Sequence, residues 1–304
     1  MSTVKPARGL IALLRLPYWL MTGGLAVLTA FAILKGDFSS IQTTIGNMAF
    51  GLVALLTFIS MAFIASAGFA INDYFDRESD AVIKPKRPIP SGALSLKQVV
   101  FVSGALFALG LILSSLINWL SFFIIAVDSL LLLLYSYMVK KKSGFAANLL
   151  MGILTGTAFI YGQATISDTV NLTSITLYPI AFGTIGGNVL RDILSLEGDS
   201  KVGYPTLPQK IGTISAAKVG AIFFLLTGLL APLPAIPFFT GHFTVYYLPL
   251  ILLWSILLIY ASIRLMTSAS TVQNIRKYER IVTMSMILLP LSLIIEAVLG
   301  WLLV

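Results

Sequence analysis

The sequence predicts an all-α membrane protein, with nine transmembrane helices around a central cavity and a cytoplasmic N-terminus. Three observations support this fold class. Apolar runs long enough to cross a bilayer recur along all 304 residues. Only 11% of the residues are charged, compared with roughly 25% in an average soluble domain. The basic residues also gather in alternate loops, which is typical of a chain that crosses the membrane repeatedly. We therefore expect one transmembrane domain over residues 1–304.

A transmembrane helix needs about 20 mostly apolar residues. The stretches that meet this requirement are 10–34, 44–71, 97–117, 119–139, 146–166, 174–191, 213–237, 244–265 and 281–303. With these nine spans, all of the 20 lysines and arginines except Lys35 fall on one side of the membrane. The positive-inside rule makes that side cytoplasmic and places the C-terminus outside.

The net charge of +8 fits this topology, so we expect a multi-pass protein of the cell membrane and no nucleic-acid partner. The chain has no cysteine, which excludes disulfides, thiolate catalysis and cysteine-ligated zinc. Most of its 12 acids gather in two clusters, one after the second predicted span and one after the sixth. These clusters are Asp73, Asp76, Glu78 and Asp80, and Asp192, Glu197 and Asp199.

The two clusters match each other in sequence. "DYFDRESD", at 73–80, aligns with "DILSLEGD", at 192–199, without a gap, so that an acid pairs with an acid at three positions. Ser195 stands where the first cluster has Asp76. This pseudo-repeat of the motifs at 72–80 and 192–199 predicts two related groups of helices with a site between them.

The acids of the first cluster have a spacing that favours metal binding. Asp73, Asp76 and Asp80 share one face of a helix, where like charges repel and require a compensating cation. Neighbouring Lys or Arg side chains can supply it, and so can a divalent ion. Oxygen ligands without His or Cys favour Mg²⁺, Mn²⁺ or Ca²⁺, and Mg²⁺ typically joins carboxylates to substrate phosphates. The candidate metal ligands are Asn72, Asp73, Asp76, Asp80, Asp192 and Asp199. The simpler alternative is that these acids only keep the loops soluble.

Four segments carry a resemblance to a known family. "NDYFDRESD" resembles the N-D-x-x-D-x-x-x-D signature of the UbiA superfamily of intramembrane prenyltransferases, and "KRPIPSG" resembles its continuation. "RDILSLEGDSKVGYPTLP" resembles the second aspartate-rich stretch of the family, and "YSYMVKKK" is similar to its Tyr/Lys segment. The resemblance covers nearly the whole chain. Ser195 departs from it, because the common second motif has an aspartate there.

The resemblance implies transfer of an isoprenyl group from an allylic, geranylgeranyl-type diphosphate to a lipid or aromatic acceptor. It implies Mg²⁺ as the cofactor and ionisation of the diphosphate to an allylic cation. The residues it implies for catalysis are Asp73, Asp76, Asp192, Lys140 and Tyr137. The candidate residues for substrate binding are Asn72, Arg15, Lys84, Arg87, Lys141 and Asn148; membrane topology alone also accounts for the basic residues, and Asn148 also fits a polar group at a helix end. Lys84 and Arg87 lie on a Pro-rich loop that could close as a lid.

The acceptor stays open at this point. The first motif and "PSGALS" favour geranylgeranylglyceryl phosphate, whereas Ser195 favours a chlorophyll-type alcohol precursor, and a quinone precursor is a third choice. A secondary transporter is the alternative from another class, but it predicts acids near the midplane of the membrane. The aspartate spacing of a lipid phosphotransferase acting on CDP-alcohols is not present. The expected partners are the two substrates and the lipid bilayer, without an obligate protein partner.

Overall fold

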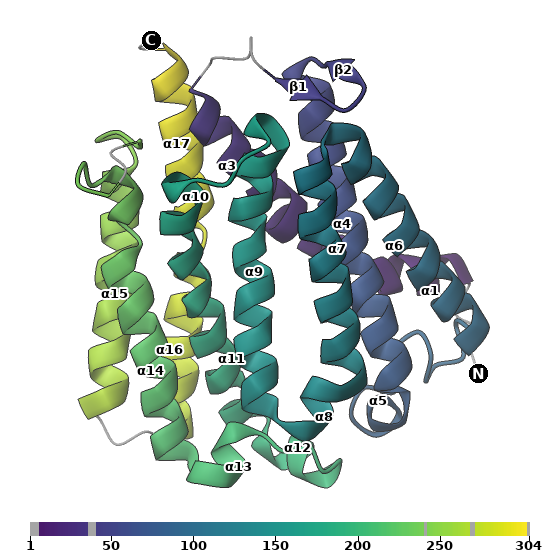
Figure 1. Ribbon diagram of the computed structural model, residues 1–304. Coiled ribbons are helices and arrows are strands. Elements are labelled where there is room, and N and C mark those ends of the chain that lie inside the picture. The colour runs from purple at the N-terminus through teal and green to yellow at the C-terminus, as the bar shows by residue number, and fades with distance from the viewer. Residues whose placement is uncertain (1–5, 36–40, 240–241, 268–270, 303–304) are drawn as a thin grey trace.

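The computed structural model describes residues 6–35, 41–239, 242–267 and 271–302, which form a bundle of helices (Figure 1). The first half contains α1 (Pro6–Leu14), α2 (Pro17–Trp19), the π-helix η1 (Leu20–Gly24), α3 (Leu25–Leu34), β1 (Gln42–Thr43), β2 (Gly46–Asn47), α4 (Phe50–Phe75), α5 (Arg77–Ile83), α6 (Leu96–Ile117), α7 (Trp119–Leu134), the π-helix η2 (Tyr135–Val139) and α8 (Lys140–Lys142). The second half contains α9 (Gly144–Ser167), α10 (Leu172–Leu177), the 3₁₀-helix η3 (Tyr178–Ala181), α11 (Phe182–Leu194), α12 (Leu196–Lys201), α13 (Leu207–Ile211), α14 (Thr213–Leu230), the 3₁₀-helix η4 (Leu233–Ala235), α15 (Leu248–Thr267), α16 (Val272–Ser285) and α17 (Leu288–Leu302).

The all-helical membrane fold predicted from the sequence is confirmed, but the number of spans is confirmed only in part. Among the described residues, eight helices are long and apolar enough to cross a membrane. The stretch left out is 174–191, because the 3₁₀-helix η3 divides it into α10 and α11. Pro179 lies in η3, and a proline has no N–H to continue the α-helical hydrogen bonds. The ninth span, the central cavity and the cytoplasmic N-terminus stay predictions.

The helices form two groups with α3 and α9 between them. In Figure 1, α4, α6 and α7 lie on the right and α11, α14, α15 and α16 on the left. Helix α3 packs against α9 and α17. The α3–α9 contact is close because α9 carries a glycine there: a Cβ on Gly162 would lie 2.3 Å from the carbonyl oxygen of Ala26. Small residues allow such close backbone approach between membrane helices.

Polar caps set several helix boundaries at the ends of the bundle. Ser95 begins α6 with a capping box. The Ser95 hydroxyl accepts a hydrogen bond from the Gln98 backbone N–H, and the Gln98 side chain accepts one from the Ser95 backbone N–H. Asn118 begins α7, where its side-chain oxygen accepts a hydrogen bond from the Ser121 backbone N–H. Its side-chain amide donates a hydrogen bond to the carbonyl oxygen of Ala164 in α9. The caps therefore satisfy backbone groups that α-helices leave without partners.

The first span is bent at Arg15. This residue has φ +50°, in the left-handed region that a residue with a Cβ rarely adopts. Pro17 then begins α2 two residues later. The bend separates α1, which lies at the right-hand side in Figure 1, from α3, which continues through the bundle. A strained conformation of this kind is common where a side chain must be aimed at a functional site.

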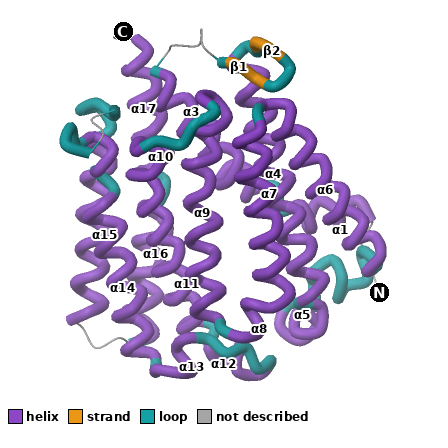
Figure 2. The backbone as a smooth tube through the Cα atoms, viewed as in Figure 1, coloured by secondary structure: helices purple, strands orange, loops and turns teal. Residues whose placement is uncertain are grey.

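Loops and short elements gather at the two ends of the bundle (Figure 2). We call the end with α5, α8, α12 and α13 the motif end, and the end with β1 and β2 the hairpin end. At the hairpin end, the fully buried Glu296 of α17 accepts hydrogen bonds from the backbone N–H and the hydroxyl of Thr244, at 2.9 and 2.6 Å. Its carboxylate lies 3.6 Å from the Lys35 ammonium. These contacts join α3, α17 and the segment before α15.

Candidate active site

The acids of the first motif lie where α4 gives way to α5. Helix α4 ends at Phe75, and Asp76 connects it to α5 with φ −89° and ψ 1°. Asp73, Asp76 and Asp80 are only 2%, 4% and 5% exposed. The Glu78 side chain, by contrast, is 87% exposed and pairs with Arg77. The three aspartates are therefore buried, which is not the position of acids that only solubilise a loop.

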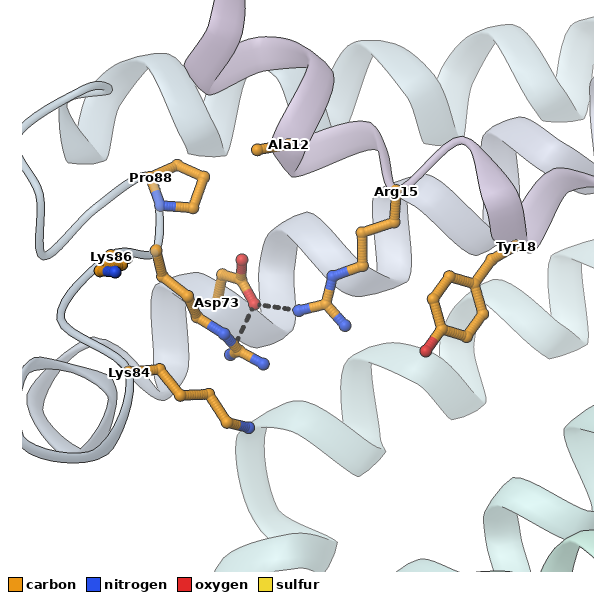
Figure 3. Close-up of a pocket in the computed structure, with 8 residues that line it drawn as sticks. Ala12, Arg15, Tyr18, Asp73, Lys84, Lys86 and Pro88 are labelled. Atoms are coloured by element: carbon orange, nitrogen blue, oxygen red, sulfur yellow. Dashed lines mark hydrogen bonds and ion pairs between the residues drawn. The ribbon is translucent and has the colours of Figure 1, made fainter. Parts of the chain in front are cut away.

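Two arginines hold Asp73 and Asp80. The Arg15 Nη2 and Arg87 Nη1 atoms lie 2.6 and 2.9 Å from Asp73 Oδ1. Arg87 Nη1 also lies 2.5 Å from Asp80 Oδ2. Figure 3 shows the Arg15 guanidinium on one side of the Asp73 carboxylate and a second bonded group on the other. The sequence separates these arginines from Asp73 by 58 and 14 positions, and the fold brings them to one point.

Asp76 has a different set of partners. The Lys140 ammonium of α8 forms an ion pair with Asp76 Oδ2, and the Asn72 amide donates to the same oxygen at 2.9 Å. The Tyr204 hydroxyl donates to Asp76 Oδ1 at 2.7 Å. The Asn72 Oδ1 atom is buried and has no hydrogen-bond partner. An unsatisfied oxygen beside a carboxylate is a group that a hard cation such as Mg²⁺ would satisfy.

The two aspartates of the second motif have neutral partners, whereas Glu197 forms an exposed ion pair with Lys201. The Asn148 amide donates to Asp192 Oδ2 at 2.7 Å, and the Ser195 hydroxyl donates to Asp199 Oδ2 at 2.5 Å. Across the described ranges, no ion pair joins Asp192 or Asp199 to a basic side chain, and Lys140 acts on Asp192 only at longer range. The two motifs therefore differ in their buried or partly buried aspartates: those of the first motif form ion pairs with Lys and Arg, whereas Asp192 and Asp199 of the second do not.

Tyr204 connects the two motifs. It lies between α12 and α13, after the second motif, and its hydroxyl contacts both Asp76 and the Ser79 hydroxyl, which is 2.9 Å away. The Lys140 ammonium lies 4.8 Å from the centre of its ring. Burial, together with the hydrogen bond to Asp76, raises the pKa of Tyr204 above its usual value, although the Ser79 hydrogen bond opposes the shift. The phenol thus stays protonated and can donate to the carboxylate.

Tyr137 and Lys141 both pack against Phe75, the residue before Asp76. Tyr137 is 63% exposed, and its ring packs edge-on against Phe75 with the centroids 5.6 Å apart. The Lys141 ammonium lies 5.5 Å from the centre of the same Phe75 ring. Tyr135, two residues earlier, is within electrostatic range of both Asp76 and Asp192. Both tyrosines lie in the π-helix Tyr135–Val139, whose turn is wider than that of an α-helix.

A cavity of about 400 Å³ lies beside Asp73 (Figure 3). We call it the basic pocket; it is lined by Ala12, Arg15, Tyr18, Asp73, Lys84, Lys86, Arg87 and Pro88. The fold thus brings together three of the predicted substrate-binding residues, Arg15, Lys84 and Arg87. Partial desolvation lowers the pKa of Lys84 below its usual value, and the Arg87 guanidinium lowers it further.

No group of three or more His, Asp or Glu side chains is arranged to hold a metal ion by itself in the part of the chain that the structure describes. The predicted ligands are instead spread over two motifs, and the first three aspartates contact cations. This arrangement fits a Mg²⁺ ion that takes one or two carboxylates and completes its coordination with substrate phosphates. The unsatisfied Asn72 oxygen beside Asp76 fits the same role.

Comparison with known proteins places this geometry in a family. The model of the UbiA prenyltransferase family matches residues 26–289. The digeranylgeranylglyceryl phosphate synthase of Natronomonas pharaonis is 36% identical over 231 residues, which are 76% of this chain and 79% of that protein. The enzyme of the same name from Methanosphaera stadtmanae is 33% identical over 222 residues, which are 72% of this chain and 80% of that protein.

Solved structures of other proteins have the same fold as this chain. A digeranylgeranylglyceryl phosphate synthase has a TM-score of 0.77 and 28% identity, covering 96% of this chain and 99% of that one. A UbiA homologue from Archaeoglobus fulgidus, bound to GPP and Mg²⁺, shares the fold with a TM-score of 0.61 and 19% identity, covering 94% and 99% of the two chains. The resemblance seen in the motifs is thus confirmed, and nothing supports a transporter. The protein is an enzyme that transfers isoprenyl groups within a multi-pass membrane fold, and the chain belongs to the UbiA prenyltransferase family.

Proposed function

We propose that this prenyltransferase moves a geranylgeranyl group from geranylgeranyl diphosphate to the free hydroxyl of geranylgeranylglyceryl phosphate, with Mg²⁺ as the cofactor. The acceptor is supported by relatives named for the product digeranylgeranylglyceryl phosphate, which align with 76% and 72% of the chain. The observation that carries the proposal is the cluster around Asp76, where an unsatisfied Asn72 oxygen, the Lys140 ammonium and Tyr204 from the loop after the second motif meet.

The diphosphate end of the donor binds between the two motifs in this proposal. The Lys140 ammonium donates hydrogen bonds to the diphosphate oxygens in this proposal, because hydrogen bonds between charged groups are stronger than those between neutral groups. When bound, Mg²⁺ would stabilise the negative charge that develops on the leaving group. The proposed metal ligands are Asn72, Asp73, Asp76, Asp80, Asp192 and Asp199. Asn148 positions the Asp192 carboxylate by its hydrogen bond of 2.7 Å.

The chemical step exchanges one carbon–oxygen bond for another. The bond between the allylic carbon and the diphosphate breaks, and its electron pair leaves with the diphosphate. The acceptor hydroxyl oxygen then bonds to the allylic carbon, and the released diphosphate takes up the hydroxyl proton. Apolar helices exclude water that would otherwise quench the allylic cation. We assign the aromatic face toward the cation to Tyr135 of the π-helix η2, since Tyr137 is 63% exposed and packs against Phe75.

The motif end faces the cytoplasm in this proposal, because the sequence places all its basic residues except Lys35 on that side. Lys35 lies at the hairpin end, beside Glu296 and Gly300 of α17. Such an arrangement would take both anionic substrates from the side on which soluble diphosphates are made.

The direct test incubates purified protein with labelled geranylgeranyl diphosphate, Mg²⁺ and three acceptors: geranylgeranylglyceryl phosphate, a chlorophyll-type precursor and an aromatic quinone precursor. The expected result is labelled digeranylgeranylglyceryl phosphate, formed only when Mg²⁺ is present. Preferred labelling of another acceptor would contradict the proposed acceptor, and product formation unaffected by chelation would contradict the proposed cofactor.

A further inference from the structure

The basic pocket carries more positive charge than its one carboxylate can neutralise. Four of its lining residues are cationic: Arg15, Lys84, Lys86 and Arg87. Asp73 is shared between Arg15 and Arg87. Neither Lys84 nor Lys86 forms an ion pair with a carboxylate among the residues that the structure describes. A cavity of about 400 Å³ with this surplus is suited to an anion.

The pocket holds one arginine in a fixed orientation. Arg15 lies at the bend of the first span, with φ +50°. Its guanidinium carbon lies 4.5 Å from the centre of the Phe69 ring, and its Nη2 atom bonds to Asp73. Figure 3 shows Arg15 and Lys84 entering the pocket from different segments of the chain. A guanidinium held in place loses little freedom when it binds a phosphate, for which its planar set of donors is well matched.

The basic pocket adjoins the proposed diphosphate site and shares Asp73 with it, but the cations of the two sites are different. Its lining comes from the first span, α4 and the loop after α5. Lys140 and Tyr204, which contact Asp76, belong to α8 and to the loop after α12, and neither lines the pocket. A reaction between two anionic substrates requires a separate place for each negative group. Lys140 beside Asp76 and the pocket lysines Lys84 and Lys86 provide two separate groups of cations for this purpose.

Apolar groups border the basic pocket on the side of the first span. Ala12, Tyr18 and Pro88 belong to its lining. Ile11 and Leu20, which are near Ala12 and Tyr18 in the sequence, are 57% and 72% exposed and lie within the first candidate membrane span, Pro6–Leu34. A ligand with a phosphate in the pocket and a hydrocarbon chain along these residues would satisfy both surfaces. A lipid phosphate has this chemistry, and a free phosphate has only half of it.

We propose that the basic pocket binds the phosphate group of the lipid acceptor, and that Lys84 and Lys86 make the enzyme prefer a phosphorylated acceptor over the corresponding alcohol. This inference rests on the proposed function, since it assumes a glyceryl phosphate acceptor. It assigns Arg15, Lys84 and Arg87 to the acceptor instead of the donor. Lys86 becomes a residue that sets acceptor specificity.

The test measures steady-state kinetics with labelled geranylgeranyl diphosphate and two acceptors, geranylgeranylglyceryl phosphate and geranylgeranylglycerol, which lacks the phosphate. The variants are Lys86→Ala, Lys84→Ala and the conservative Lys86→Arg. Lys97→Ala is the matched control, because Lys97 is an exposed lysine in the first turn of α6 outside the pocket. Each variant is first checked for an unchanged elution volume in detergent, which shows that it folds.

The expected result is a rise in KM for the phosphorylated acceptor of about ten-fold or more in each alanine variant, the effect of losing a charge-assisted contact. The KM for geranylgeranyl diphosphate and the rate with geranylgeranylglycerol stay within two-fold, and Lys86→Arg restores most of the affinity. A rise in the KM for the donor, or no rise for either substrate, would overturn the inference.

The failure of the pocket inference can be told from the failure of the proposed function. If the wild-type enzyme prenylates both glycerol acceptors equally well, the basic pocket has no role in acceptor choice, whereas prenyl transfer to a glycerol lipid stands. If the wild-type enzyme prenylates neither acceptor but does prenylate an aromatic one, the proposed function is wrong and the inference falls with it.

Discussion

Tyr204 donates a hydrogen bond of 2.7 Å to Asp76, which lies 128 positions earlier in the chain. This contact joins the loop of the second motif to the carboxylate at the centre of the first. It also orders the loop over the site, because the same hydroxyl contacts Ser79 at 2.9 Å. The position of Asp76 therefore depends on a residue that belongs to neither acid cluster.

We expect Tyr204→Phe to lower kcat/KM for geranylgeranyl diphosphate by roughly ten-fold or more, since a hydrogen bond to a charged group is worth about 1.5–3 kcal/mol. The ring remains, so the contact with the Lys140 ammonium persists. The measurement is prenyl transfer at several donor concentrations. Tyr246→Phe, at the hairpin end, should match the wild type, and an equal loss in both variants would mean that the effect is one of general stability.

We expect Asp76→Asn and Asp192→Asn each to lower activity by at least about 100-fold and to raise the Mg²⁺ concentration needed for half-maximal rate. An amide keeps the shape of the carboxylate and removes its charge. Glu78→Gln is the control from the same motif, because its side chain is 87% exposed and paired with Arg77. The measurement is a Mg²⁺ titration of each variant. An unaltered titration in the Asp192 variant would remove the second motif from the metal site.

We expect Lys84 to react with an amine-modifying reagent at lower pH than Lys97. The pKa of Lys84 is lowered by partial desolvation and by Arg87, and a lowered pKa means that more of the amine is neutral and nucleophilic at a given pH. Reductive methylation across a pH series, read by mass spectrometry, gives both profiles. A bound phosphate should protect Lys84 and shift its profile to higher pH. Coincident profiles for the two lysines would refute the expected shift.

We expect Glu296→Gln to destabilise the protein without changing its KM values at temperatures below the unfolding transition. The substitution removes the negative charge that lies 3.6 Å from Lys35 in a fully buried position. A loss of about 1–3 kcal/mol corresponds to a fall of several degrees in the apparent melting temperature. Thermal unfolding in detergent measures it. Glu197→Gln, in an exposed pair with Lys201, should leave the melting temperature unchanged.

Hydropathy and length predict most of this fold, because the bilayer fixes both for every spanning helix. The prediction falls short where the backbone departs from a regular helix. The proline in η3 divides one predicted span into α10 and α11, and each of these helices is too short to cross the membrane by itself. No glycine marks the bend at Arg15 in the sequence. A left-handed φ at an arginine is set by the surrounding contacts, which helical periodicity does not predict.

The candidate site was predictable as a set of residue types but not as a set of contacts. Spacing alone indicates that Asp73, Asp76 and Asp80 lie together, and the structure buries all three. Helical periodicity cannot place Tyr137, because the π-helix η2 changes the phase of its turn. Tyr204 was also missed, although it lies in the "GYPTLP" segment that resembles the family, since nothing local marks a loop tyrosine as a partner of Asp76.

The cations on Asp73, Asp76 and Asp80 have a consequence for the enzyme between turnovers. Arg15, Arg87 and Lys140 are tethered counter-ions, so the first motif can stay folded when neither metal nor substrate is near. In the proposed reaction, an arriving metal–diphosphate complex would take over these carboxylates, which would free Lys140 for the diphosphate and Arg15 and Arg87 for the acceptor phosphate. After the reaction, the same side chains can reclaim the carboxylates and help to expel the products. The side chains that neutralise the first motif would thus return it to its substrate-free state after each turnover.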